Sequence, residues 1–304
     1  MFANLRRTRS ERTDYSCRSS DTSPDEAQQR SRRRSVELTR HRRTTINERN
    51  DSPPPQPLQK RLTNTLLETS QEQFDAATKH PFLRAAGQGK VSKHELSRWL
   101  SQDRLYAEAY VSFISSLIAR VSLPFSYVQD KGVSLRWRIV ELLTGCLENI
   151  QTEIQFFTDT AEQYRLRLDQ PWDNYGSFGP NPVTEQYINL FTSFHLDPQQ
   201  TLLEGLLVLL ATGKCYLEAW TYASIHLAHD ISAESDQDGG ALRDKFIPNW
   251  SSKDFDDFVR KIADVTDKLA QREGALKKVE VFRALWLHVL EIEKGFWPEI
   301  DLSI

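Results

Sequence analysis

Residues 202–213 read LLEGLLVLLATG, and their composition indicates how the rest of the chain is arranged. Apart from Glu204 and Thr212 it contains only apolar residues and glycine, so a helix made of it has almost no polar face. A helix that is apolar nearly all round is buried on most of its sides. We therefore predict a helix over about 199–229 whose first half lies at the centre of a helical bundle.

On both sides of this stretch, apolar residues recur at intervals of three and four, which predicts further helices. The first stops before His80-Pro81, and Ser92 with Glu95 forms a capping box that opens the second. The predicted helices cover about 63–78, 92–121, 133–165, a shorter segment after Pro182, 251–272 and 276–299. The segments 87–89, 166–181 and 230–248 are predicted as a turn and two polar loops. The fold class is all-α, a single bundle of seven or eight helices.

The composition of the 304 residues excludes several classes of protein. The three cysteines, Cys17, Cys146 and Cys215, are odd in number and far apart, which is typical neither of a disulfide scaffold nor of a zinc site. The uncharged run 205–213 is too short to cross a bilayer, and no apolar block of secretory type stands at the N-terminus. We expect a cytoplasmic protein that does not span a membrane.

The first 61 residues differ in composition from the rest of the chain. They carry a net charge of +7, whereas residues 62–304 carry −10, and they contain few large aliphatic residues. Such a segment cannot offset the entropy lost on ordering, so we predict a disordered Arg/Ser-rich tail over 1–61 and one folded domain over 62–304. Arginine clusters before Ser35 and Thr44 leave open phosphorylation or an acidic partner. No pattern of specific nucleic-acid recognition accompanies them.

Two carboxylates interrupt the apolar stripes of predicted helices. Asp103 follows Trp99 and Leu100 where the helical period calls for an apolar residue, and Glu293 does the same after Val289. Two buried acids on different helices are the minimum for general acid/base catalysis, because burial moves a carboxyl pKa toward neutrality. The alternative is that each is a structural acid held by a neighbouring hydroxyl or arginine.

A third candidate is Cys215, in the second half of the central helix. It is a nucleophile if its pKa is lowered, and otherwise a small hydrophobic residue in a packed helix; Glu218 nearby is a further candidate acid. Metal chemistry finds little support, since Glu153 is followed four residues later by Phe157, where a ligand histidine is needed. We predict no metal and no cofactor.

Four segments together resemble a known family. The stretch 80–110, HPFLRAAGQGKVSKHELSRWLSQDRLYAEAY, resembles the N-terminal hallmark of TenA-type thiaminase II proteins and of the PQQ-synthesis protein C group, which share the heme-oxygenase-like helical fold. PVTEQY at 182–187, NWSSKDF at 249–255 and EKGFW at 293–297 are similar to further family segments. The resemblance covers about 63–300 and implies a heme-oxygenase-like bundle.

The resemblance also implies roles for individual residues. Asp103 matches the acid that binds an aminopyrimidine, Tyr106 and Tyr187 match the tyrosines that clamp the ring, and Glu293 matches the proton-relay glutamate. Trp250 stands where the cysteine branch has another active-site tyrosine. The implied protein binds a small heterocycle, hydrolyses a C–N or amide bond of a thiamine-related aminopyrimidine, and assembles as a dimer or tetramer.

The central helix departs from the cysteine branch of the family. It lacks the proline that precedes the nucleophile there, and its pattern from Ala211 to Trp220 resembles the cysteine-less branch. A register shifted by about two residues instead places Cys215 on the family cysteine. Two alternatives therefore stay open beside the hydrolase: a binding or regulatory protein without catalysis, and a heme-oxygenase-like redox protein with His80 as the ligand candidate.

Overall fold

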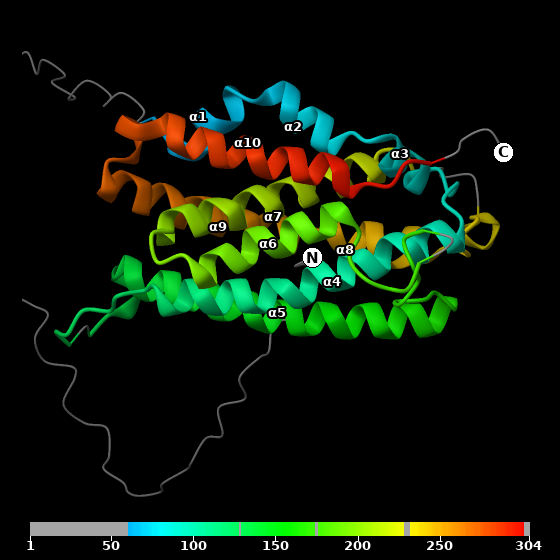
Figure 1. Cartoon of the computed structure of the whole chain (residues 1–304), viewed down its shortest axis with the longest axis horizontal. Helices are drawn as coiled ribbons and strands as arrows, with labels where there is room; N and C mark the ends of the chain where they lie inside the picture. The colour runs from blue at the N-terminus through cyan, green and yellow to red at the C-terminus, as the bar shows by residue number, and fades with distance from the viewer. Residues whose placement is uncertain (1–59, 128, 174–175, 228–231, 301–304) are drawn as a thin grey trace, which may run out of the picture. The chain divides into compact units, whose positions relative to one another are not determined.

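The structure, a computed structural model, describes residues 60–300 except 128, 174–175 and 228–231. Within these ranges the chain is helical and contains no strand, so the predicted all-α bundle is confirmed (Figure 1). The tail predicted over 1–61 lies almost wholly outside the described residues. The α-helices are α1 (Leu62–Glu68), α2 (Gln71–Thr78), α3 (Pro81–Gly87), α4 (Lys93–Ala119), α5 (Leu135–Tyr164), α6 (Pro182–Leu196), α7 (Leu202–Ser224), α8 (Ile247–Trp250), α9 (Lys253–Glu273) and α10 (Val279–Phe296).

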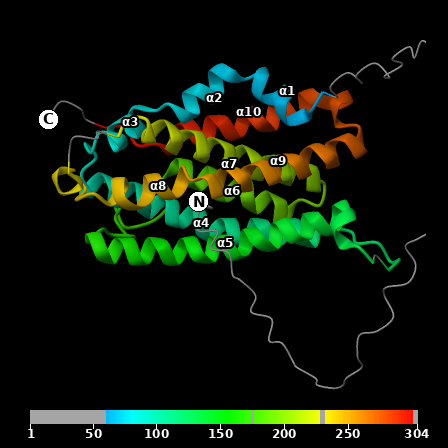
Figure 2. The ribbon, with the colours of Figure 1, turned by 180° about the vertical axis from the view of Figure 1, so that it is seen from behind.

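Helix α7 lies at the centre of the bundle, as its composition predicts. Every residue from Gly205 to Gly213 is buried. It packs against α9, α10, α3, α8 and α2, and both ribbon views show it between the α4–α5 side and the α10 side (Figures 1 and 2). Gly205 lets α4 come close, because a Cβ there would stand 2.2 Å from the Leu117 side chain. This arrangement surrounds the second half of α7 with side chains from several helices.

The first predicted helix is divided in two, which corrects the prediction of one helix over 63–78. Helix α1 ends at Glu68 and α2 begins at Gln71. Ser70 at the break donates from its hydroxyl to the Leu66 carbonyl at 2.6 Å and accepts from the Trp286 indole of α10 at 2.9 Å. A side chain that bonds the backbone one turn earlier competes with helix continuation.

Two short helices form where the sequence pattern predicts a helix end, at Pro81, and a polar loop, over 230–248. His80 caps α3, its Nδ1 accepting from the Phe82 amide at 3.2 Å, and Pro81 fills the first turn, where no amide hydrogen is needed. The second half of the loop predicted over 230–248 is likewise helical: a π-helical turn, Leu242–Phe246, leads into α8. Together with the division of the first predicted helix, α3 and α8 bring the α-helices of the described residues to ten, against the seven or eight predicted, and α8 carries Trp250.

The other predicted boundaries hold to within a few residues, with one clear exception. Helix α7 ends at Ser224 instead of reaching 229. The capping box of Ser92 and Glu95 is present at α4, whereas α9 is capped by Ser252, one residue after the predicted start at Ser251. Long amphipathic segments are thus predicted well, and connections poorly.

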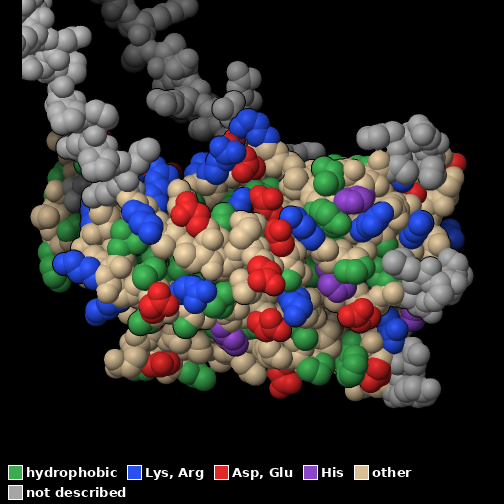
Figure 3. All heavy atoms as spheres, turned by 90° about the horizontal axis from the view of Figure 1, so that it is seen from above, with side chains coloured by type: hydrophobic (Ala, Val, Ile, Leu, Met, Phe, Trp, Pro, Cys, Tyr) green, Lys and Arg blue, Asp and Glu red, His purple; other side chains and the backbone are tan. Residues whose placement is uncertain are grey.

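The surface of the bundle carries charges of both signs. On the face shown in Figure 3, acidic and basic side chains are interspersed. Several of these side chains form ion pairs. For example, Nζ of Lys79, just after α2, lies 2.8 Å from Oδ2 of Asp75. Among the described residues, no helix is both long and apolar enough to cross a membrane.

Candidate functional site

Asp103 lies on the inner face of α4 and is fully buried. Its Oδ2 accepts a hydrogen bond from the Tyr216 hydroxyl of α7 at 2.9 Å, and its Oδ1 has no partner. Burial raises the pKa of Asp103 to about 7, and the Tyr216 hydrogen bond opposes that rise. The group can therefore exchange a proton near neutral pH, and it has one oxygen free to accept a hydrogen bond from a ligand.

Glu293 occupies the inner face of α10 and is 3% exposed. Burial raises its pKa to about 8, and the nearby Asp103 carboxylate adds to the rise. The Tyr187 hydroxyl, on α6, faces Glu293 and lowers that pKa in part, although the geometry is too poor for a well-formed hydrogen bond. A raised pKa favours the protonated form of Glu293 toward neutral pH, which suits a group that donates a proton.

Tyr106 and Tyr187, the two tyrosines that the resemblance assigns to ring binding, are in contact with each other. The ring centroids of Tyr106 and Tyr187 are 4.9 Å apart, and the two rings meet at an interplanar angle of 87°. The ring centroid of Phe296 lies 5.6 Å from that of Tyr187. Burial is the largest cause of the raised pKa of both tyrosines, and the Glu293 charge is the second. Both hydroxyl groups therefore lie near the same carboxylate. The structure thus brings Asp103, Glu293 and both tyrosines together, with the rings edge to face and not parallel.

Trp250 joins the same cluster through Tyr216. Its ring centroid lies 5.2 Å from that of Tyr216 and 4.6 Å from that of Trp220. Its indole Nε1 donates to Oε1 of Glu153, on α5, at 2.6 Å. Both Trp250 and Glu153 are fully buried, so this hydrogen bond is shielded from solvent.

Sequence reasoning missed Glu153 and Tyr216 as members of the cluster. The sequence pattern relates Glu153 only to metal binding, for which the required histidine is missing. Glu153 nevertheless lies seven residues after Cys146 and three after Ile150, on the apolar stripe of its helix. The signal that identified Asp103, an acid on an apolar stripe, was therefore available for Glu153 as well. Tyr216 offered no comparable signal, because a tyrosine is common on a buried face.

Cys215 lies in the cluster, but its chemistry is poor. The thiol is fully buried, and burial followed by the Glu293 charge raises its pKa well above the ordinary value, which Lys214 only partly opposes. A thiol in such surroundings stays protonated and is a weak nucleophile. Glu218 does not point into the cluster: its side chain is 38% exposed and pairs with Lys214.

Metal ligands are not assembled in the described part of the chain. No group of three or more histidine, cysteine or acidic side chains there is close enough to hold an ion. The His80 imidazole, the ligand candidate of the redox alternative, accepts a backbone hydrogen bond as the cap of α3.

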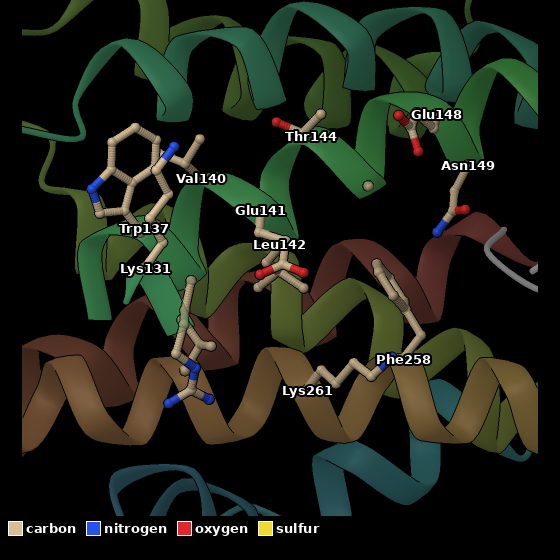
Figure 4. A pocket seen from close by; sticks show the side chains of 13 residues that line it. Lys131, Trp137, Val140, Glu141, Leu142, Thr144, Glu148, Asn149, Phe258 and Lys261 are labelled. Atoms are coloured by element: carbon tan, nitrogen blue, oxygen red, sulfur yellow. The ribbon is translucent and has the colours of Figure 1, made fainter. Parts of the chain in front are cut away.

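A surface groove of about 800 Å³ runs between α5 and α9, outside this cluster (Figure 4). Lys131 lies over the Trp137 ring at one end, 4.3 Å from its centroid, while Asn149 and Phe258 line the other end. None of the predicted site residues lines the groove. The groove is therefore distinct from the site.

Comparison with known proteins agrees with the fold. A soybean (Glycine max) protein described as a probable bifunctional TENA-E protein is 22% identical over 238 residues, 78% of this chain and 91% of its own length. A Fusarium pseudograminearum protein described as a probable transcription factor is 26% identical over 236 residues, 69% of this chain. The chain spans only 45% of the length of the Fusarium relative.

Among solved structures, a TenA homologue from Pyrococcus furiosus superposes with a TM-score of 0.61 at 20% identity, covering 78% of this chain and 98% of that one. This likeness concerns the fold. The sequence model of one family, TENA/THI-4/PQQC, matches residues 68–301, which hold every helix from α2 to α10 and all the acids of the buried cluster. On that match, the chain belongs to the TENA/THI-4/PQQC family.

Proposed function

We propose that this protein binds a small nitrogen heterocycle of the thiamine-related aminopyrimidine type and hydrolyses a C–N bond attached to it. The observation that carries the proposal is the pair Asp103 and Glu293, two buried acids from different helices whose pKa values burial raises to about 7 and about 8. Acids of this kind are poised for proton transfer near neutral pH. The ligand class is the one that the resemblance of residues 80–110, 182–187, 249–255 and 293–297 to TenA-type proteins implies.

Each acid has a separate role in this mechanism. The free Oδ1 of Asp103 accepts from the amino group of the ring, and the buried rings of Tyr106 and Tyr187, which lie edge to face, contact the ligand from one side. Glu293 gives its proton to the departing nitrogen and takes one from the attacking water, whose hydroxyl group stays on carbon. Water is the nucleophile because the Cys215 thiol is held protonated.

The test separates binding from catalysis. We expect thiamine or 4-amino-2-methylpyrimidine to raise the melting temperature of the full chain, because a ligand that binds only the folded state stabilises it. With a substrate that is turned over, Glu293→Gln should lower kcat by about a hundredfold or more with little change in Kd. Glu291→Gln is the matched control, since that exposed side chain lies two residues earlier on α10.

A binding protein without catalysis is the second candidate, and the buried, protonated thiol of Cys215 favours it. It predicts ligand binding that Asp103→Asn weakens, with no product detectable by mass spectrometry. The cytoplasmic location and the dimer or tetramer implied by the family resemblance stay predictions; light scattering of the purified chain measures the assembly.

A further inference from the structure

Glu153 has the same local arrangement as Asp103. It is fully buried on α5, one of its oxygens accepts from an aromatic side chain, and the other has no partner. In Asp103 the paired oxygen is Oδ2, bound by Tyr216, and in Glu153 it is Oε1, bound by Trp250. A buried polar atom without a partner costs about 1–3 kcal/mol, so two such oxygens in one region need an explanation.

The two acids belong to one cluster. Tyr216, which donates a hydrogen bond to Asp103, packs against Trp250, which donates one to Glu153; the two ring centroids are 5.2 Å apart. The Glu153 charge also raises the pKa of Asp103 and of Tyr216. The unpaired oxygens of Asp103 and Glu153 therefore belong to one electrostatic environment, reached from α4 and α5.

The chemistry of Glu153 follows from its pairing. Burial raises its pKa, and the hydrogen bond from Trp250 and the nearby Asn249 amide oppose only part of that rise. When the acid is protonated, the proton resides on Oε2, because Oε1 already accepts from the indole. Oε2 then becomes a hydrogen-bond donor that makes no well-formed hydrogen bond, with the Asn249 amide nearby.

We propose that Glu153 is a second ligand-binding acid of this site, which meets a ring nitrogen on the edge opposite to the edge held by Asp103. The site then selects a ring that has nitrogen on both edges, as a 4-aminopyrimidine has. Asp103 accepts from the amino group through its free Oδ1, and Glu153 shares its proton with the distant ring nitrogen. This inference rests on the proposed function and names the part of the ligand that Glu153 recognises.

Two probes of matched shape test it. 4-Amino-2-methylpyrimidine carries both ring nitrogens, whereas 2-amino-6-methylpyridine keeps the amino group, the adjacent nitrogen and the methyl group but has CH at the distant position. We expect calorimetry on the full chain to show at least about tenfold tighter binding of the pyrimidine, the scale of one buried hydrogen bond. In Glu153→Met this preference should fall below about threefold.

Comparing the ratio of affinities between variants cancels differences intrinsic to the two probes. Glu148→Met, at an exposed position of the same helix, should keep the full preference. Glu153→Gln should keep most of it, because the amide oxygen can accept from Trp250 while the amide nitrogen donates to the ring. A structural role for Glu153 predicts a different result: the melting temperature changes, but the preference is the same in all variants.

The outcomes separate this inference from the proposed function. If the unsubstituted chain binds neither probe, both are wrong. If it binds both and Glu153→Met leaves the preference intact, the Glu153 assignment is wrong and the proposed function stands. If Glu153→Met does not fold, Trp250→Phe decides, because loss of the indole donor releases the carboxyl group from its fixed orientation and should also reduce the preference.

Discussion

Two aspartates of this chain, Asp103 and Asp238, are both fully buried, and their surroundings differ. Asp238 lies before the π-helical turn, where Oδ1 accepts from the Gly240 amide at 3.0 Å and Oδ2 from the Leu242 amide at 2.6 Å. Asp103 has a single partner, the Tyr216 hydroxyl, and one oxygen without any. Burial alone therefore does not distinguish the two; the number of satisfied oxygens does.

The difference separates a structural acid from a functional one. Both oxygens of Asp238 are occupied by backbone amides that have no other way to be satisfied in a buried turn, so the group completes the local fold. Oδ1 of Asp103 has no hydrogen-bond partner although it is surrounded by aromatic rings, which suits a group that binds a ligand. Substitutions at the two positions should accordingly affect different quantities.

The largest effect is expected at the structural acid. Asp238→Ala leaves the Gly240 and Leu242 amides buried and unpaired, so the free energy of unfolding should fall by about 3 kcal/mol. Urea denaturation measures this change. Glu234→Ala, at an exposed position of the same connection, is the control and should change stability by less than about 0.5 kcal/mol. A loss as small in Asp238→Ala as in the control would remove the contrast between the two acids.

The functional acid should give the reverse pattern. Asp103→Asn keeps the shape but removes the charged acceptor, so ligand binding should weaken by about 2–3 kcal/mol. The free energy of unfolding should not fall, because a neutral amide is less costly to bury than a carboxylate with one unpaired oxygen. Calorimetric titration and urea denaturation of the same sample measure the two quantities. Lower stability with unchanged affinity would identify Asp103 as structural.

This contrast was only partly visible in the sequence. Asp103 and Glu293 were predicted because each interrupts an apolar stripe of a long helix, where the helical period fixes which side faces inward. Asp238 was not singled out, because it lies in a segment predicted as a polar loop, and no periodicity predicts which loop residues become buried. For the same reason the helix α8, which ends at Trp250, was not predicted, although the family resemblance assigns Trp250 to the site.

The pairing of polar groups was the least predictable feature. The hydrogen bonds Tyr216–Asp103 and Trp250–Glu153 join residues 113 and 97 positions apart. Such partners depend on how whole helices pack, and helix packing leaves several rotations open for one amphipathic pattern. The sequence thus predicted which helices form and two of the buried acids, whereas the unpaired oxygens became visible only in the structure.

Stability should depend on pH in a way that the functional acids determine. The folded-state pKa values of Asp103 and Glu293, about 7 and about 8, lie above the values near 4 of an unfolded chain. Between about pH 5 and pH 7 the folded state therefore binds more protons, and stability falls as pH rises, by up to about 1.4 kcal/mol per pH unit for each acid. Asp103→Asn should make the decline shallower. Equal slopes in variant and parent chain would contradict the raised pKa of Asp103.

The smallest effect is expected at Cys215, which shares the cluster with Asp103 but has no function in the proposed mechanism. Its thiol is fully buried, its pKa is raised by burial and by Glu293, and the side chain acts there as a small packed group. Cys215→Ser should therefore change ligand affinity and kcat by less than about threefold, as isothermal titration and product assays can measure. A covalent nucleophile behaves differently, because its removal costs several orders of magnitude in kcat. Such a loss in Cys215→Ser, with affinity retained, would show that the thiol attacks the substrate, and the role of water in the proposed hydrolysis would then be wrong.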